Sequence, residues 1–183
     1  SPAGHGKKGP TIDEGISQSI RNQFNDEIPQ LFVYSQLLLS INGHDGRYGT
    51  CHTPMKFWAA WREEDITDPQ MYALRNHPLS TEQIHALFDH RPSVDLKWYQ
   101  QLIDGGELAV SGQDKLLISL LSPERLLEMT RFFTLFDKKT GKIVARYQQV
   151  FGIKRLLERI STRRPDGGRE GGVIWHTTGS GKS

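Results

Sequence analysis

The chain has 183 residues, a net charge of +2 with neutral histidines, 36% hydrophobic residues and 24% charged residues. This composition is typical of a soluble globular protein, and so small a charge does not by itself indicate nucleic-acid binding. The single cysteine, Cys51, excludes an internal disulfide and a cysteine-rich metal site, and it fits a cytoplasmic location. No apolar run approaches the ~20 residues that cross a bilayer, so we expect no membrane association.

The first predicted element is a helix that follows a start rich in Gly, Pro and Lys. Thr11 and Glu14 form a capping-box pair, in which the two side-chain oxygens accept hydrogen bonds from otherwise unpaired backbone amides. Isoleucines then recur every four positions and share one helical face. We expect this helix to end near Phe24.

A β-hairpin is predicted next. Leu31–Ile41 is rich in Leu, Val, Phe and Tyr and predicts a buried strand, and Arg47–His52 predicts its partner. Residues 42–46, Asn-Gly-His-Asp-Gly, predict the turn between them. The aromatic segment that follows should cover the sheet, and its members are Phe57, Trp58 and Trp61.

Helices with polar connections are predicted for the middle of the chain. Residues 63–78 are polar with scattered prolines, and we interpret them as a connecting region. A second capping box beginning at Ser80 predicts a helix through Phe88, and a further helix is expected over Asp95–Ile103, before two glycines. Ser122 predicts another helix start, because Ser suits the N-cap and the proline that follows suits the first helical position.

The last part of the chain predicts a turn, a helix and a short strand. The turn is Asp137–Gly141, followed by the extended stretch Ile143–Ala145. Apolar residues then recur at helical spacing from Val150 to Ile160. Val173–Trp175 predicts a short strand that leads into the final residues.

Residues 177–183, Thr-Thr-Gly-Ser-Gly-Lys-Ser, predict a phosphate-binding loop. Gly179 and Gly181 permit backbone angles that turn successive amides toward an anion. Lys182 would contact the β- and γ-phosphates of a nucleotide, and Ser183 would ligate its Mg²⁺. The complete set of loop residues predicted to bind the nucleotide is Thr178, Gly179, Ser180, Gly181, Lys182 and Ser183.

This loop has other interpretations. The strict pattern requires Gly where this chain has His176, and a flexible Gly/Ser linker in a non-enzymatic interaction module is one alternative. Kinases, small GTPases and transporters also use such a loop, so another nucleotide-hydrolysing protein is a second alternative. A kinase or GTPase domain usually starts close to its loop, whereas a long stretch of predicted helices and strands precedes this one.

The segment Arg146-Tyr-Gln-Gln149 lies upstream of the loop, with an amphipathic helix between them. In helicase-like motors a glutamine in this place recognises adenine, because an amide can both donate to and accept from one base edge. We therefore predict that Arg146 and Gln149 contribute to ATP binding. A polar helix start is the alternative interpretation.

Residues 169–183, Arg-Glu-Gly-Gly-Val-Ile-Trp-His-Thr-Thr-Gly-Ser-Gly-Lys-Ser, resemble the first motor motif of the restriction (R) subunits of type I restriction–modification enzymes. That family commonly has a histidine at the start of this loop, which accounts for His176. The segment Arg146–Gln149 resembles the adenine-reading element of the same family.

Residues 18–38 resemble the segment that follows the nuclease site in these subunits. The matching stretches are Gln-Ser-Ile-Arg-Asn-Gln from Gln18, Glu-Ile-Pro-Gln-Leu-Phe from Glu27 and Tyr-Ser-Gln-Leu-Leu from Tyr34. The family helix carries a Gln-x-x-x-Tyr element, in which Gln18 has the Gln position and Asn22 replaces the Tyr. The resemblance implies that Gln18 is a nuclease-associated residue, and a surface amide on a helix is the alternative.

The resemblance implies an α/β fold in three parts. Residues 1–62 would be the distal part of a restriction-endonuclease-like nuclease domain, 63–140 a mainly helical connector, and 141–183 the start of the first RecA-like motor domain. The implied enzyme uses ATP and Mg²⁺ to translocate double-stranded DNA, and it cleaves unmodified foreign DNA away from the recognition site. Its implied partners are the methyltransferase (modification) and specificity subunits.

The metal-binding nuclease residues of the family precede the region that matches. Because the sequence begins at Ser1 and stops inside the loop, we expect it to be a piece of a longer subunit. We expect these residues by themselves to show neither ATP turnover nor DNA cleavage.

Overall fold

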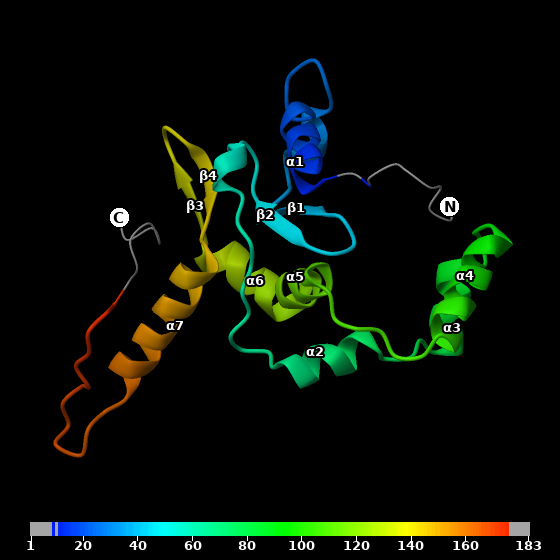
Figure 1. The fold of residues 1–183 in the computed structure, drawn as a ribbon. Coiled ribbons are helices and arrows are strands. Elements are labelled where there is room, and N and C mark those ends of the chain that lie inside the picture. Colours follow the sequence, from blue (N-terminus) through cyan, green and yellow to red (C-terminus); the bar gives the residue numbers. More distant parts are fainter. Residues whose placement is uncertain (1–8, 10, 176–183) are drawn as a thin grey trace.

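The computed structural model describes residue 9 and residues 11–175, which combine α-helices with two small antiparallel sheets (Figure 1). In chain order the elements are α1 (Ile12–Arg21), the 3₁₀ helix η1 (Pro29–Phe32), β1 (Leu38–Ile41), β2 (Gly46–Gly49), the 3₁₀ helix η2 (Met55–Phe57), α2 (Asp68–Arg75), α3 (Thr81–Phe88), α4 (Ser93–Asp104), α5 (Gly112–Leu121), α6 (Pro123–Phe132), β3 (Thr134–Asp137), β4 (Gly141–Val144) and α7 (Tyr147–Ser161). The predicted α/β character is confirmed at this level. Among the residues described, no helix has the length and apolar character needed to span a membrane.

Helix α1 begins where its capping box predicted. The Thr11 hydroxyl accepts a hydrogen bond from the Glu14 N–H, and the Glu14 carboxylate accepts one from the Thr11 N–H at 2.7 Å. The helix ends at Arg21, three residues before the predicted Phe24. Ile16 is its buried residue. The helix contacts β1, whose Ser40 hydroxyl donates to the Ile12 carbonyl.

The predicted hairpin is confirmed, but both strands are shorter than predicted. Strand β2 ends at Gly49, so residues 50–52 were wrongly predicted as strand. Strand β1 is confined to Leu38–Ile41, and the residues before it contain η1. Pro29 lacks an N–H for a sheet and has a φ that suits a helical turn. The apolar residues of this part lack a covering layer, and the exposed ones are Leu31, Val33 and Tyr34. Residues 31–37 were therefore wrongly predicted as strand.

Hydrogen bonds within the turn and from the second strand hold the hairpin in place. The Asn42 side-chain oxygen accepts hydrogen bonds from the N–H groups of His44 and Asp45, and Gly43 has φ +90°, which favours glycine. Tyr48 in β2 also exchanges two backbone hydrogen bonds of 2.9 Å with Ala59. The predicted covering segment is confirmed for the two tryptophans, Trp58 and Trp61, which are buried, whereas Phe57 is exposed.

The middle of the chain is more helical than predicted. The starts predicted at Ser80 and Ser122 and the helix over Asp95–Ile103 are confirmed by α3, α6 and α4. Helices α2 and α5 were not predicted. Thr67 and Ser111 cap them, each in a reciprocal pair with the side chain three residues later.

The predicted turn at Asp137–Gly141 joins β3 to β4. The Asp137 carboxylate accepts from the backbone amides of Lys139 and Thr140. The predicted strand Val173–Trp175 is not formed, and Val173 and Trp175 are almost fully exposed. A strand requires hydrogen bonds from a neighbouring strand, and none of the described residues provides one here.

One hydrophobic core joins segments from distant parts of the chain. Figure 1 shows the β1–β2 hairpin lying over α5 and α6, with α7 leading away from the β3–β4 sheet and α3 and α4 set apart. The buried members of the core are Tyr48, Trp61, Leu116, Leu120, Met129, Phe133, Val150 and Phe151. The division into domains at 1–62, 63–140 and 141–183 stays a prediction. Residues from each of these ranges contribute to this core.

Candidate functional site

The start of α7 carries the two described residues that were predicted to bind a nucleotide. Arg146 is the N-cap, and its N–H donates to the Gln149 side-chain oxygen at 2.9 Å. Val150 and Phe151 follow and are buried, which anchors the first turn of the helix in the core. The structure therefore brings Arg146 and Gln149 together, and the capping role of Gln149 confirms the alternative interpretation of this segment as a polar helix start.

Ala145, the residue before the N-cap of this helix, is held from two sides. The Ala145 N–H donates to the Phe133 carbonyl at 2.9 Å, and the Ala145 carbonyl accepts from the Tyr48 hydroxyl at 2.8 Å. Tyr48 is 1% exposed, and its ring meets the Trp61 ring edge-on at 5.7 Å. Burial raises the pKa of the Tyr48 hydroxyl, so this group stays protonated and remains a hydrogen-bond donor.

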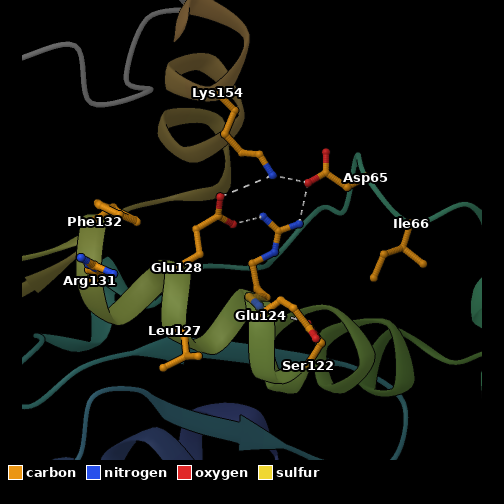
Figure 2. Close-up of a pocket in the computed structure, with 10 residues that line it drawn as sticks. Asp65, Ile66, Ser122, Glu124, Leu127, Glu128, Arg131, Phe132 and Lys154 are labelled. Carbon is orange, nitrogen blue, oxygen red and sulfur yellow. Dashed lines mark hydrogen bonds and ion pairs between the residues drawn. The ribbon is translucent and has the colours of Figure 1, made fainter. Parts of the chain in front are cut away.

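A cluster of charged side chains holds the second turn of α7. We call it the Arg125 cluster, and its members are Glu63, Asp65, Arg125, Glu128 and Lys154. The Arg125 guanidinium lies 3.0 Å from Glu63, 2.9 Å from Asp65 and 2.9 Å from Glu128. Figure 2 shows Lys154 reaching down from α7 toward Asp65 and Glu128, with which it forms ion pairs.

Aromatic rings enclose the same guanidinium. Its central carbon lies 5.4 Å from the Trp61 ring centroid and 5.1 Å from that of Phe151. The Trp61 indole N–H donates to Glu63 at 2.8 Å. Arg125 is thus a buried charge with three carboxylate partners and two aromatic faces, an arrangement that compensates for its loss of hydration.

The electrostatics of Asp65 follow from this environment. Burial acts to raise the pKa of the Asp65 carboxyl, but hydrogen bonds from Lys154 and Arg125 outweigh burial and hold the pKa below its ordinary value. The carboxylate is therefore the stable form at neutral pH.

An open depression of about 550 Å³ lies beside the Arg125 cluster. Its wall combines apolar side chains such as Leu127 and Phe132 with charged ones such as Glu124 and Arg131 (Figure 2). The cations of the cluster already pair with carboxylates, so the arrangement serves to cross-link three segments of the chain rather than to hold an anion. Within residues 9 and 11–175, no group of three or more His, Cys, Asp or Glu side chains could hold a metal ion.

The other predicted site residues have different outcomes. Thr178, Gly179, Ser180, Gly181, Lys182 and Ser183 lie outside the described residues. Gln18 is exposed on α1, a helix that contacts β1 and η2 rather than α7. Asn22, which replaces the family tyrosine, donates its backbone N–H to the Gln18 carbonyl at 2.9 Å.

Sequence reasoning missed Tyr48 and Arg125, two residues that help to connect the first half of α7 to other segments. Tyr48 follows a Gly-rich turn, and Arg125 sits in the polar first turn of a predicted helix. An arginine in such a turn is usually exposed, and its burial here depends on contacts with residues some sixty positions away. No local pattern signals that burial.

Two family models match separate parts of the chain. Residues 6–57 match the N terminus of the type I restriction enzyme R protein, and residues 148–183 match the SWI2/SNF2 ATPase. Tyr48 belongs to the first matched segment, and Gln149 and Val150 belong to the second. No solved structure matches the chain significantly.

Similar proteins cover nearly the whole chain. The chain is 31% identical over 170 residues to the endonuclease subunit of the type I restriction enzyme HindI from Haemophilus influenzae. It is 26% identical over 179 residues to the putative type I restriction enzyme MjaIXP endonuclease subunit from Methanocaldococcus jannaschii. These alignments cover 88% and 91% of this chain but 13% and 15% of the relatives, so the chain spans a small part of their length.

The order of the matched segments agrees with the resemblance found in the sequence, and both relatives carry the same description. The chain belongs to the family of type I restriction enzyme endonuclease (R) subunits.

Proposed function

We propose that the chain is the part of an ATP-dependent DNA translocase and endonuclease subunit in which the nuclease region is joined to the first motor domain. The observation that carries the proposal is the order of the two family matches along one chain, R-protein N terminus at 6–57 and SWI2/SNF2 ATPase at 148–183. The core supports it, because Tyr48 from the first segment packs with Val150 and Phe151 from the second. The two regions would then act as one unit.

The nucleotide would be ATP with Mg²⁺. Lys182 would contact its phosphates and Ser183 its Mg²⁺, with Thr178, Gly179, Ser180 and Gly181 surrounding the phosphates. Hydrolysis of ATP supplies the free energy for movement along DNA.

Gln149 fits a base-reading role. Its carboxamide is oriented by the hydrogen bond to the Arg146 N–H. A base edge is read by directional hydrogen bonds, so a carboxamide that is already held in one orientation suits its recognition. The polar helix start and the adenine-reading element are therefore compatible interpretations of the same residues.

The substrate would be unmodified double-stranded DNA, cleaved at a distance from the recognition site in the cytoplasm. A modification subunit and a specificity subunit would provide site recognition. Gln18, exposed on α1, would support the nuclease reaction. The alternative of an unrelated kinase or GTPase has no comparable support, because the matched ATPase class is SWI2/SNF2.

The decisive experiment is Lys182→Ala in the full-length subunit, assembled with its partner subunits and unmodified plasmid DNA. We expect DNA-stimulated ATP hydrolysis to fall about 100-fold or more, because one cation that stabilises the transferring phosphate is lost. DNA cleavage should fall with it. Lys97→Ala, which changes an exposed lysine of α4, is the matched control and should retain both activities. Wild-type ATP hydrolysis in the Lys182→Ala complex would contradict the proposal.

A further inference from the structure

Tyr48 makes a contact beside the predicted base-reading residues. It comes from β2, in the segment that matches the R-protein N terminus, and its hydroxyl donates to the Ala145 carbonyl at 2.8 Å. Arg146, the N-cap of α7, is the next residue along the chain. A side chain of the nuclease-side hairpin therefore holds the peptide group that enters the motor-side helix.

The geometry of this peptide leaves little freedom. The Ala145 N–H is bound to the Phe133 carbonyl, and Val144 pairs with Thr134 in the β3–β4 sheet. After Ala145, the Arg146 N–H is bound to the Gln149 side chain. The Tyr48 hydrogen bond completes this series from a different part of the chain, and it restrains the carbonyl side of the peptide between residues 145 and 146.

A purely space-filling role does not explain the hydroxyl. The Tyr48 ring packs against Trp61 and within the core, and a phenylalanine would fill the same space. The hydroxyl is buried, and its hydrogen bond goes to a main-chain carbonyl at the entrance to α7 rather than to a neighbouring side chain. Losing it would leave that partly buried carbonyl without this donor and let the peptide plane move.

We propose that Tyr48 is a positioning residue for nucleotide recognition, which through Ala145 holds Arg146 and Gln149 in the orientation that selects an adenine base. This inference rests on the proposed ATP-dependent function and extends it to a residue outside the nucleotide-binding segment. Selection of a base depends on directional hydrogen bonds, so a small tilt of the helix start changes which base is accepted more than it changes the chemistry at the phosphates.

The test compares hydrolysis of ATP and GTP by the full-length Tyr48→Phe subunit in its complex, with DNA present. We expect the KM for ATP to rise about tenfold, the loss that accompanies one hydrogen bond, while kcat stays close to that of the wild type. The KM for GTP should change little, so the preference for ATP over GTP should fall by about the same factor. Thermal midpoints measured in parallel show whether the variant remains folded.

Tyr72→Phe is the matched control. It also removes one tyrosine hydrogen bond, to Glu107, but Tyr72 lies on α2, away from the start of α7. It should leave the ATP/GTP preference unchanged. Ala145→Gly is a second variant, which keeps Tyr48 intact but loosens the same peptide, and it should lower the preference in the same direction.

The outcomes separate the two proposals. An unchanged ATP/GTP preference in both Tyr48→Phe and Ala145→Gly, while Lys182→Ala abolishes hydrolysis, overturns the positioning role and leaves the proposed function standing. An equal fall of kcat for both nucleotides with a lowered thermal midpoint also overturns it, because a purely structural role predicts that pattern. Full hydrolysis by Lys182→Ala would overturn the proposed function and this inference together.

Discussion

Two helical regions of the molecule differ sharply in how they are held. Helices α5, α6 and α7 each bury side chains in the common core, where Leu120, Met129 and Val150 are fully buried. Helices α3 and α4, which we call the α3–α4 arm, bury none of their residues, and Trp98 is 62% exposed. The arm is stabilised by local contacts, such as the Phe88 and Tyr99 rings at 5.2 Å.

The difference shows that helix formation and helix packing have separate causes here. Ser80 caps α3 and Ser122 caps α6 in the same way, through a hydroxyl that accepts from the amide three residues later. Only the second of these two helices has a buried face. We therefore expect the arm to open locally at a low free-energy cost, whereas α5, α6 and α7 should unfold only with the whole domain.

The largest effect is expected from Arg125→Ala. It would leave Glu63, whose side chain is 3% exposed, as a buried charge without its guanidinium partner. Breaking a buried pair in this way lowers the free energy of unfolding by about 3–5 kcal/mol, and chemical denaturation would measure it. Arg131→Ala on the same helix changes an exposed arginine outside the cluster and should cost less than about 0.5 kcal/mol. Equal losses for the two variants would show that the Arg125 cluster does not stabilise the fold.

Replacing one leucine by alanine in each region tests the difference between the core helices and the α3–α4 arm. Leu120→Ala in α5 removes a fully buried side chain and should lower the free energy of unfolding by about 2–5 kcal/mol. Leu87→Ala in the arm changes a side chain that is 44% exposed and should cost well under about 1 kcal/mol. Hydrogen exchange adds the spatial readout, since Leu87→Ala should speed exchange in α3 and α4 alone. Faster exchange throughout α5 and α6 in that variant would contradict the independence of the arm.

The smallest effect is a dependence of stability on pH through Asp65. Because the pKa of Asp65 is lower in the folded state than in the unfolded state, the folded state binds fewer protons. Its stabilising contribution is therefore fully present above the unfolded-state pKa, about 4, and is lost as the pH falls through the lowered folded-state pKa. Thermal midpoints measured from about pH 6 to about pH 2 should decrease less steeply in Asp65→Asn than in the wild type. An identical slope would show that the ion pairs of Asp65 make no net contribution.

Signals confined to a few neighbouring residues predicted several local features correctly. The pairs at Thr11 and Ser80, the Ser-Pro start at Ser122 and the turn after Ile41 all act within five residues, and the structure confirms each. Helix α5 was missed although Ser111 and Asp114 cap it, because its apolar run gives no clear helical period. Strands were less predictable, since a strand requires a partner that may lie anywhere in the chain.

The sequence alone indicated the family, the starts of helices α1, α3 and α6, and the identity of the residues proposed to bind ATP. These properties depend on the chemistry of short segments, which is readable without coordinates. The tertiary structure alone decided that Tyr48 meets Ala145, that Arg125 is buried between Trp61 and Phe151, and that the arm packs against so little of the chain. The reason is physical: burial and long-range pairing are set by which distant segments share a core, and no local pattern encodes that choice.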